Sequence, residues 1–324
     1  MKMRYLKINA ALISALSERW RPEIHTFHLR CGECTITLQD VLVLLGLCIE
    51  GAPLIGPTNL DWANLCEELL GVRPQEGELE GSVVKLSWLT HHFSQLNNHD
   101  GNVEQLQRFT RAWILRFIGG VLFVNKSSSR VSLRYLQFLR DFQPCSMYAW
   151  GPTVLAYLYR EMCSATDCKI KSIGGMCILI QMWAWERCTT LAPKRTPPVI
   201  ENKPLGHRWL RRGNQHIGND DLRFVWEPYT TTVMSTLPPI CMVGSVAWFT
   251  VVPLICFHVV EWHQPDRVLR QFGMQQPILE CPSQPQNLHG ITLKGKQDEN
   301  WGQLWAPLIS QWNNRAEFRV DVYP

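Results

Sequence analysis

Apolar residues recur at helical spacing along most of the chain. The predicted helices cover, in chain order, residues 9–16, 38–46, 59–70, 86–96, 103–123, 131–142, 153–163, 173–188, 265–272 and 298–315. A recurrence every three or four residues gives each helix one apolar face, which it buries against the others. The pattern therefore predicts a mainly α, multi-helix globular domain.

A small β-hairpin is predicted near the N-terminus. Thr26 and His28, and then residues 35–37, alternate around Cys31-Gly32-Glu33, which places Gly32 in the turn. Thr37 is predicted to cap the helix that follows, with the Asp40 carboxylate in its first turn and Gly46 at its end.

The domain prediction is a single domain over residues 1–324. Residues 191–204 contain four prolines and no apolar periodicity, so they mark a linker or long loop and a candidate subdomain boundary. The glycine pairs 119–120 and 174–175 fall inside apolar helices and indicate close helix packing.

One segment has the length of a membrane span. Residues 228–260 contain no Asp, Glu, Lys or Arg, and residues 240–260 are strongly apolar. Pro253 interrupts the segment, and Glu261, His263 and Asp266 follow without a Lys/Arg cluster. We expect a buried core segment and no membrane partner.

The N-terminal residues also lack a secretory pattern, which predicts free thiols in a reducing compartment.

Composition excludes a disordered chain. The 324 residues are 46% hydrophobic and 19% charged, which is ample for a sizeable core. The net charge of +4 is too small to require a nucleic-acid partner. The 14 tryptophans are expected to be core anchors, because basic residues are not interleaved with them as in a stacking groove.

Two clusters carry residues that ligate metals or transfer protons. His25, His28, Cys31 and Cys34 are zinc-ligand types at a spacing of three, but this spacing alternates faces on a strand and no second Cys-x-x-Cys completes a site. Local hydrogen bonds of the imidazoles are the favoured alternative.

The second cluster comprises Cys256, His258, Glu261 and His263. His258 and Glu261 would share a helix face, so a hydrolase or transferase is one hypothesis. His-Glu-x-x-His, the nucleophile elbow, the Walker loop and the dinucleotide fingerprint are all absent from the sequence. An ion-pair network with Asp266 or Arg267 is favoured. We expect no catalytic residues, no cofactor and a non-enzymatic protein.

A short basic and aromatic stretch suggests a nucleic-acid contact. His207, Arg208, Arg211 and Arg212 surround Trp209, and phosphates attract such patches. A solvated surface is the alternative explanation of the same residues.

Residues 18–47 read ERWRPEIHTFHLRCGECTITLQDVLVLLGL and resemble the opening motif of the plant mobile domain family, also called the aminotransferase-like plant mobile domain. Further stretches match in the family's order: LCEELLG (65–71), LSWL (86–89), RAWILRFIGGVLF (111–123), WGPTVLAYLYREMC (150–163), IGGMCILIQMWAWER (173–187), PLGHRW (204–209), VWEPY (225–229), VPLICFHVVEWHQPDRVLRQFGMQQ (252–276) and residues 301–315. The resemblance covers nearly the whole chain. Between His216 and Val225 the chain is shorter than the family pattern.

The resemblance implies a transposon-related nuclear plant protein. It implies action through nuclear protein partners in transposon silencing, gene expression or meristem maintenance. A serine/threonine phosphatase-type partner is expected, because long-form homologues of serine/threonine phosphatase seven carry a related domain. A transposon-derived nucleic-acid-binding protein is the alternative function. No pyridoxal lysine supports the aminotransferase-like label.

Charged residues embedded in the apolar motifs are predicted to form partly buried ion pairs, because such charges are seldom buried without partners. The candidates are Glu18, Arg19, Arg21, Glu23, Glu261, His263, Asp266, Arg267 and Arg270.

These pairs would pin the terminal segments to the helical core. Arg267→Ala should then lower the melting temperature clearly, because removing one partner of a buried pair costs about 3–5 kcal/mol. Thermal unfolding followed by circular dichroism measures the change. A variant with full stability but impaired partner or nucleic-acid binding would instead identify the segment as a functional surface.

Overall fold

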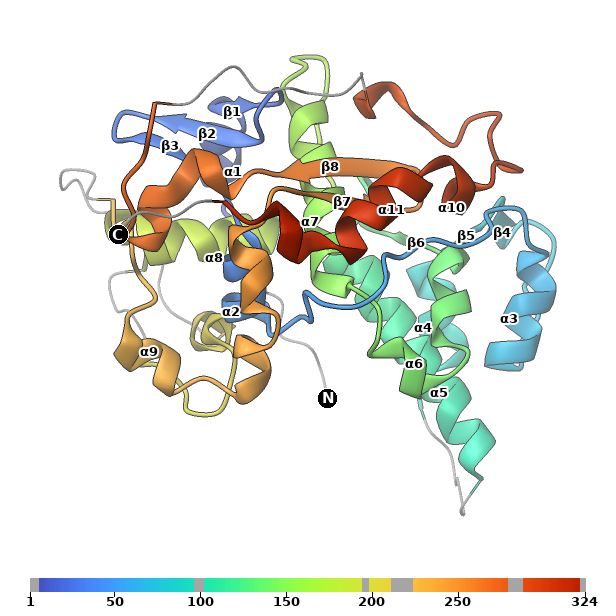
Figure 1. The fold of residues 1–324 in the computed structure, drawn as a ribbon. Helices are drawn as coiled ribbons and strands as arrows, with labels where there is room; N and C mark the ends of the chain where they lie inside the picture. Colours follow the sequence, from blue (N-terminus) through green and yellow to red (C-terminus); the bar gives the residue numbers. More distant parts are fainter. Residues whose placement is uncertain (1–5, 96–101, 194–197, 211–223, 279–287, 321–324) are drawn as a thin grey trace.

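Helix predominates in the computed structural model, which describes residues 6–95, 102–193, 198–210, 224–278 and 288–320. The strands within these ranges form small antiparallel sheets (Figure 1). The predicted fold class, mainly α with an N-terminal β-hairpin, is confirmed.

The α-helices are α1 (Ala10–Ser17), α2 (Leu38–Leu45), α3 (Trp62–Leu70), α4 (Leu86–His92), α5 (Val103–Phe117), α6 (Phe142–Cys145), α7 (Trp150–Ala165), α8 (Cys177–Arg187), α9 (Thr231–Ser235), α10 (Trp301–Leu304) and α11 (Ala306–Asn313). A π-helical turn, Ile118–Leu122, extends α5. Short 3-10 segments cover Leu133–Leu139, Thr189–Leu191, Leu205–Leu210, Pro239–Met242, Ser245–Phe249, Pro265–Phe272, Leu288–Gly290 and Arg315–Phe318.

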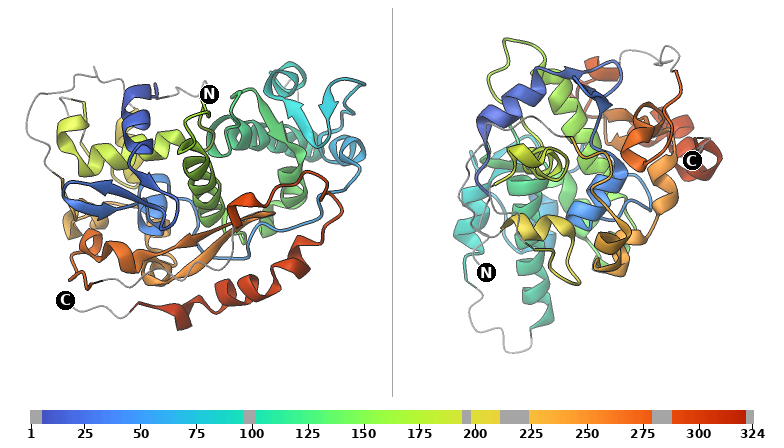
Figure 2. Two further views of the ribbon diagram at one scale, coloured as in Figure 1. Left: turned by 90° about the horizontal axis from the view of Figure 1, so that it is seen from above. Right: turned by 90° about the vertical axis from the view of Figure 1, so that its left-hand side faces the viewer.

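Three small sheets accompany the helices in the part of the chain that the structure describes. They contain β1 (Trp20–Arg21), β2 (Thr26–Leu29) and β3 (Gly32–Cys34); β4 (Leu79–Glu80), β5 (Val83–Lys85) and β6 (Arg130–Ser132); and β7 (Val252–Cys256) with β8 (Val259–His263). The first two sheets lie at opposite ends of the molecule (Figures 1 and 2). In the third, Leu254 lies opposite Glu261.

Helix α7 forms the centre of the packing. Eleven of its 16 residues are buried, and it packs against α2 and against the β7–β8 hairpin (Figure 2). A Cβ on Gly151 would lie 2.9 Å from the carbonyl oxygen of Cys48, so the start of α7 can approach this backbone only with glycine. Glu261 on β8 thereby comes to face α7.

Helix α2 begins and ends as predicted. Thr37 and Asp40 form a reciprocal capping box, and Gly46 takes the left-handed conformation at the C-terminal end. Helix α3 begins later than predicted, because the side chain that caps it belongs to Asp61 and not to Asn59.

Several other elements differ from the prediction. Residues 131–142 form β6, a 3-10 segment and the start of α6 in place of one helix. Helix α8 starts only at Cys177, since Gly175 has a φ of +78° that a helix cannot accommodate. In the N-terminal hairpin, Gly32 opens β3 and the turn falls on residues 30–31.

The uncharged segment 228–260 does not form one long helix. It builds α9, two 3-10 segments and strand β7, in which Pro253 pairs with Trp262. Within the described ranges, none of the helices combines the length and apolar character that a membrane crossing needs.

One hydrophobic core joins both sides of the proline-rich loop. Leu42 and Trp183 from before residues 191–204 belong to the same buried cluster as Leu254 and Trp312 from after it. Five tryptophans are among the largest fully buried side chains: Trp20, Trp183, Trp209, Trp301 and Trp312. These five are core anchors, as predicted for the tryptophans, whereas Trp113 on α5 is 45% exposed and departs from that prediction.

Gly119 permits the contact between the π-helical turn and β6. A Cβ at this position would overlap the Cβ of Val131. We therefore expect Gly119→Ala to reduce the free energy of unfolding by about 1–3 kcal/mol through overpacking, as measured by urea denaturation.

Gly302→Ala is the matched control, because it also adds one methyl group to a helical glycine. Its Cβ would meet nothing closer than 3.5 Å, so the variant should be neutral or more stable by up to about 1 kcal/mol. Equal losses in both variants would contradict the role assigned to the Gly119 contact.

Candidate functional site

A group of ionisable side chains surrounds Glu261. This residue lies on β8, and its side chain is only 1% exposed. A carboxylate removed from water in this way needs counter-charges within the fold. Three segments distant in sequence supply its partners: the β1–β2 connection, α7 and the 3-10 segment at residues 288–290.

Arg160 on α7 is the principal counter-charge. Its Nε donates to Oε1 of Glu261, and its two terminal nitrogens donate to the carbonyl oxygens of Val260, Leu288, His289 and Ile291. The guanidinium therefore joins α7 to β8 and to the segment that carries His289. Nearly all its hydrogen-bonding capacity is used within the protein.

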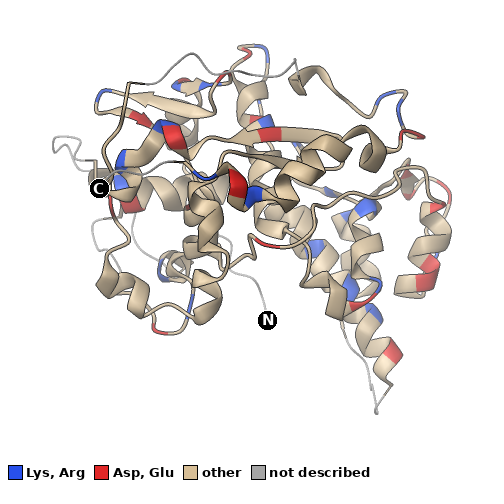
Figure 3. Cartoon of the chain, in the orientation of Figure 1, with Lys and Arg blue, Asp and Glu red and all other residues tan. Residues whose placement is uncertain are grey.

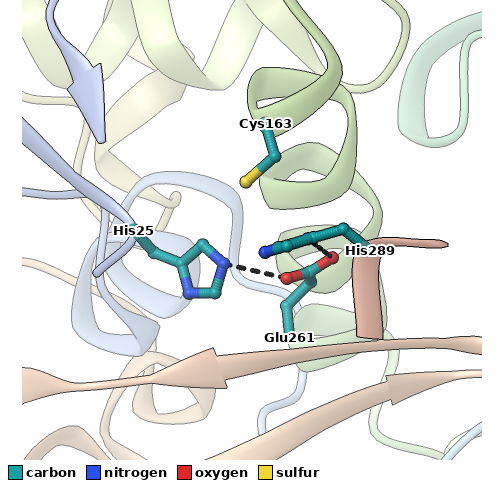
Figure 4. Close-up of side chains that lie close together, drawn as sticks. All are labelled: His25, Cys163, Glu261 and His289. Atoms are coloured by element: carbon teal, nitrogen blue, oxygen red, sulfur yellow. Dashed lines mark ion pairs between the residues drawn. The ribbon is translucent and has the colours of Figure 1, made fainter. Parts of the chain in front are cut away.

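Two histidines and one cysteine complete the group (Figure 4). Nε2 of His25 lies 2.8 Å from Oε2 of Glu261, and Nδ1 of His289 lies 3.3 Å from Oε1. The sulfur of Cys163, on α7, accepts a hydrogen bond of 3.3 Å from Nε1 of Trp20. One donor atom from each of His25, Cys163, Glu261 and His289 lies within 4.8 Å of the others, a grouping that could hold a metal ion.

Electrostatics keep this carboxylate ionised. Burial by itself raises the pKa of Glu261, but the close ring nitrogens of His25 and His289, together with the Arg160 charge, outweigh burial and hold the pKa well below its usual range. Burial raises the pKa of the Cys163 thiol far above its ordinary value. In the protein as described, this cysteine is therefore a poor nucleophile.

A second buried ion pair connects α2 to α8. Arg187 and Asp40 are both fully buried, and Nη2 of Arg187 lies 3.0 Å from Oδ1 of Asp40. The hydroxyl of Tyr229 donates to the same oxygen at 2.7 Å, and the backbone N–H of Thr37 donates to Oδ2. Arg187 also donates to the carbonyl of Trp226. The capping carboxylate of α2 thus also anchors residues 226–229.

Of the residues predicted to contact nucleic acid, those that the structure describes do not form an open basic patch. Arg208 forms a two-pronged pair with Glu186, and Trp209, 2% exposed, donates its Nε1 to the same carboxylate at 2.6 Å. His207 belongs to the same 3-10 segment. Arg211 and Arg212 lie outside the described residues. The ring of Trp209 is therefore not available to stack on a base in this conformation.

The four zinc candidates of the hairpin do not meet. His25 turns inward to Glu261, whereas His28 is partly exposed and lies 3.4 Å from Glu33. Cys34 is buried and directs its sulfur to the carbonyl of Phe27, and Cys31 is half-buried. The four residues diverge because they lie in different parts of the hairpin: His25 in the β1–β2 connection, His28 on β2, Cys31 in the turn and Cys34 on β3.

The nine ion-pair candidates occupy unlike environments. Glu261 lies in the buried group above, and Arg267 forms a two-pronged pair with Glu33, at 3.0 and 3.1 Å. The structure does not bury Glu18 and Arg19, whose side chains are 76% and 50% exposed and lie 4.0 Å apart. A prediction of burial from neighbouring aromatics fails there because both residues lie in the exposed turn that follows α1, whereas Leu16 and Ser17 at the end of the helix are buried.

The remaining candidates make other contacts. Arg21 donates to the carbonyl of Trp20, and Arg270 lies over the ring of Trp226. His263 contacts backbone groups, the N–H of Leu38 and the carbonyl of Thr250. Burial raises the pKa of Asp266, whose Oδ1 has no hydrogen-bond partner. Glu23 stands in the β1–β2 connection.

Residues 256–263 form a β-hairpin, so the expected helix face is wrong. Cys256 ends β7 and His258 lies in the turn, while Glu261 and His263 follow on β8. Burial, reinforced by Arg134 and Arg160, lowers the pKa of His258 to about 3. Burial raises the pKa of Cys256 to about 11. The histidine is thus neutral and the thiol protonated at neutral pH.

Sequence reasoning missed Arg160, Cys163 and His289 as members of the group. One signal was available, since Arg160 interrupts an otherwise apolar helical face, and an arginine there implies a buried partner. Nothing local marks His289. The role of Asp40 was recognised only as a helix cap.

We expect Arg160→Met to destabilise the protein strongly. The change leaves the Glu261 carboxylate without its main counter-charge and four carbonyls without a donor, so the loss should be about 3–5 kcal/mol in urea denaturation. Arg140→Met is the control, because its pair with Glu68 is more than half exposed and should cost only about 0–1 kcal/mol. Similar losses in both would show that the buried network contributes little.

Comparisons with known proteins identify the family. The family model described as "Plant mobile domain" matches residues 1–323. The serine/threonine-protein phosphatase 7 long form homolog of Arabidopsis thaliana is 41% identical over 347 residues, which cover 100% of this chain and 26% of that protein. Two other Arabidopsis thaliana proteins are similar. Protein MAIN-LIKE 1 is 35% identical over 99% of this chain and 64% of its own length. Protein MAINTENANCE OF MERISTEMS is 34% identical over 84% of this chain and 59% of its own length.

The chain therefore spans between 26% and 64% of the length of these relatives. No solved structure matches it. The matching family model covers essentially the whole chain, and the resemblance of the sequence motifs points to the same family. The chain belongs to the plant mobile domain family.

Proposed function

We propose that this chain is a non-enzymatic, protein-binding domain of a nuclear plant protein of transposon-related origin. It acts in transposon silencing, gene expression or meristem maintenance, and its partner is a serine/threonine phosphatase-type protein. The names of two relatives support this proposal, since one is a phosphatase homolog and another refers to maintenance of meristems.

The varied lengths of the relatives also favour a binding module. A region similar to this chain makes up 26% of one relative and 64% of another. A domain that recurs within proteins of such different length is typical of a unit that is combined with other functional parts.

The observation that carries the proposal is an exposed apolar strip on residues 240–246. Ile240, Met242, Val243 and Val246 are 43–48% exposed within seven consecutive positions. Cys241 and Ala247 are fully buried and hold the strip against the core, where the adjoining 3-10 segments pack on α2. Grouped apolar side chains on a fixed surface are typical of protein-interaction sites.

The described pocket favours binding over catalysis. A cavity of about 320 Å³ lies beside α1 and is lined mainly by apolar side chains, including Leu12, Leu16 and Leu191. Cys188 lines it, but burial raises the pKa of this thiol to about 12. An active site needs polar groups that converge on a substrate, and Asn9 and Arg19 alone do not form such a set.

Nucleic-acid binding has less support. Arg208 is neutralised by Glu186, and charged residues of both signs are intermingled over the molecule (Figure 3). A phosphate-binding surface would concentrate one sign of charge.

The apolar strip can be tested by substitution. We expect the double variant Val243→Ser, Val246→Ser to lose at least about tenfold in affinity for a phosphatase-type partner, since a well-packed residue at the centre of an interface costs more than about 1 kcal/mol when it is truncated. Plant nuclear extract is passed over immobilised chain, and serine/threonine phosphatase-type proteins are quantified by mass spectrometry. Binding of the purified partner is then measured by calorimetry.

Leu304→Ser is the matched control, because Leu304 is 46% exposed but lies on α10, outside the strip. It should bind as the unmodified chain does. Recovery of no phosphatase-type protein, or equal binding by the strip variant, would contradict the proposal. DNA binding that weakens steeply with salt would favour the nucleic-acid alternative.

A further inference from the structure

We propose that His25, Cys163, Glu261 and His289 form a structural zinc site. The site is independent of the proposed partner binding and differs from the cysteine and histidine set of the hairpin, with which it shares only His25. The donor set, two imidazole nitrogens, one sulfur and one carboxylate oxygen, is the set that Zn²⁺ prefers.

The donors converge from separate parts of the fold. Figure 4 shows the four side chains directed toward a common centre, and one donor atom from each lies within 4.8 Å of the others. Four ligands of a tetrahedral zinc, with bonds of about 2.0–2.3 Å, lie somewhat closer together than this. Binding of the ion would draw the wider pairs together and move Nε2 of His25 away from Oε2 of Glu261, which lie 2.8 Å apart.

The hydrogen bonding of His25 is the first specific observation. Its Nδ1 lies 3.1 Å from the carbonyl oxygen of Trp262, which can only accept, so Nδ1 carries the hydrogen. Nε2 is then the ring nitrogen that faces the carboxylate, and it is the atom through which His25 would bind a cation. Metal-ligating histidines characteristically donate their other N–H to a carbonyl in this way.

The contacts between the rings and the carboxylate are the second observation. Nε2 of His25 lies 2.8 Å from Glu261, yet neither it nor Nδ1 of His289 makes an aligned hydrogen bond, although both atoms are buried. Buried nitrogens almost always have a partner. A cation between these nitrogens and the carboxylate oxygens would supply it.

The surroundings support the ligands. Nε1 of Trp20 donates to the sulfur of Cys163, which favours the thiolate that zinc requires. Arg160 occupies Oε1 of Glu261 and leaves Oε2 facing His25. His25 itself has a φ of +50°, a left-handed conformation that is uncommon outside glycine and is found at functional sites.

The metal content of the purified full chain tests the site. The chain is expressed in zinc-supplemented cells, dialysed and analysed by mass spectrometry of the elements. We expect about one zinc ion per chain, which Cys163→Ser and His289→Ala each reduce to near zero. Cys168→Ser and His28→Ala are the matched controls, because the first removes an exposed thiol and the second a histidine outside the group.

A measurement on the unmodified chain keeps the test decisive if a variant fails to fold. Cobalt replaces zinc, and a thiolate-to-cobalt charge-transfer band reports one sulfur ligand. X-ray absorption of the zinc form should likewise give one sulfur and three nitrogen or oxygen neighbours. A folded chain without zinc, a zinc ion without a sulfur neighbour, or full zinc content in folded Cys163→Ser and His289→Ala would each overturn the proposal.

Discussion

A carboxylate buried as deeply as Glu261 must find its counter-charges inside the fold, and much of the architecture follows from this requirement. Arg160 reaches it from α7, His25 from the β1–β2 connection and His289 from a segment near the C-terminal end. The loss of hydration would otherwise cost several kcal/mol. One charged group thereby fixes the N-terminal and C-terminal parts of the chain against the central helix.

The buried ion pair of Asp40 and Arg187 has the same role at α2, the helix that packs against α7. Asp40 completes the helix cap with Thr37 and simultaneously neutralises an arginine from α8. A single carboxylate thus sets both where a helix begins and which helix packs beside it. The two networks turn their charges inward, whereas the apolar strip at residues 240–246 faces outward. This distribution is expected of a domain that binds partners through its surface and whose fold is stabilised by ion pairs in its interior.

Local chemistry made part of the fold predictable. Thr37, Asp40 and Gly46 specify the ends of α2 through short-range contacts, and Gly273 ends the segment that begins at Pro265. Prediction failed where packing against elements distant in sequence outweighed the local pattern of apolar residues. Apolar residues 252–263 were expected to be helical in part, yet they form a hairpin because both strands pack against α7 and β7 also packs against α11. Periodicity alone does not distinguish a fully buried strand from a buried helix.

The sequence by itself determined the family, the helical class, several helix ends and the need of Glu261 and Arg267 for partners. Each of these depends on residue type or on spacings of a few positions. Only the tertiary structure decided which partners they have: Arg160 lies 101 residues before Glu261, and Arg267 pairs with Glu33 across 234 residues. It also turned His25 away from His28 and toward Cys163 and His289. Side chains so distant in sequence meet only when the packing of α7 on the β7–β8 hairpin is complete, and no local pattern records that packing.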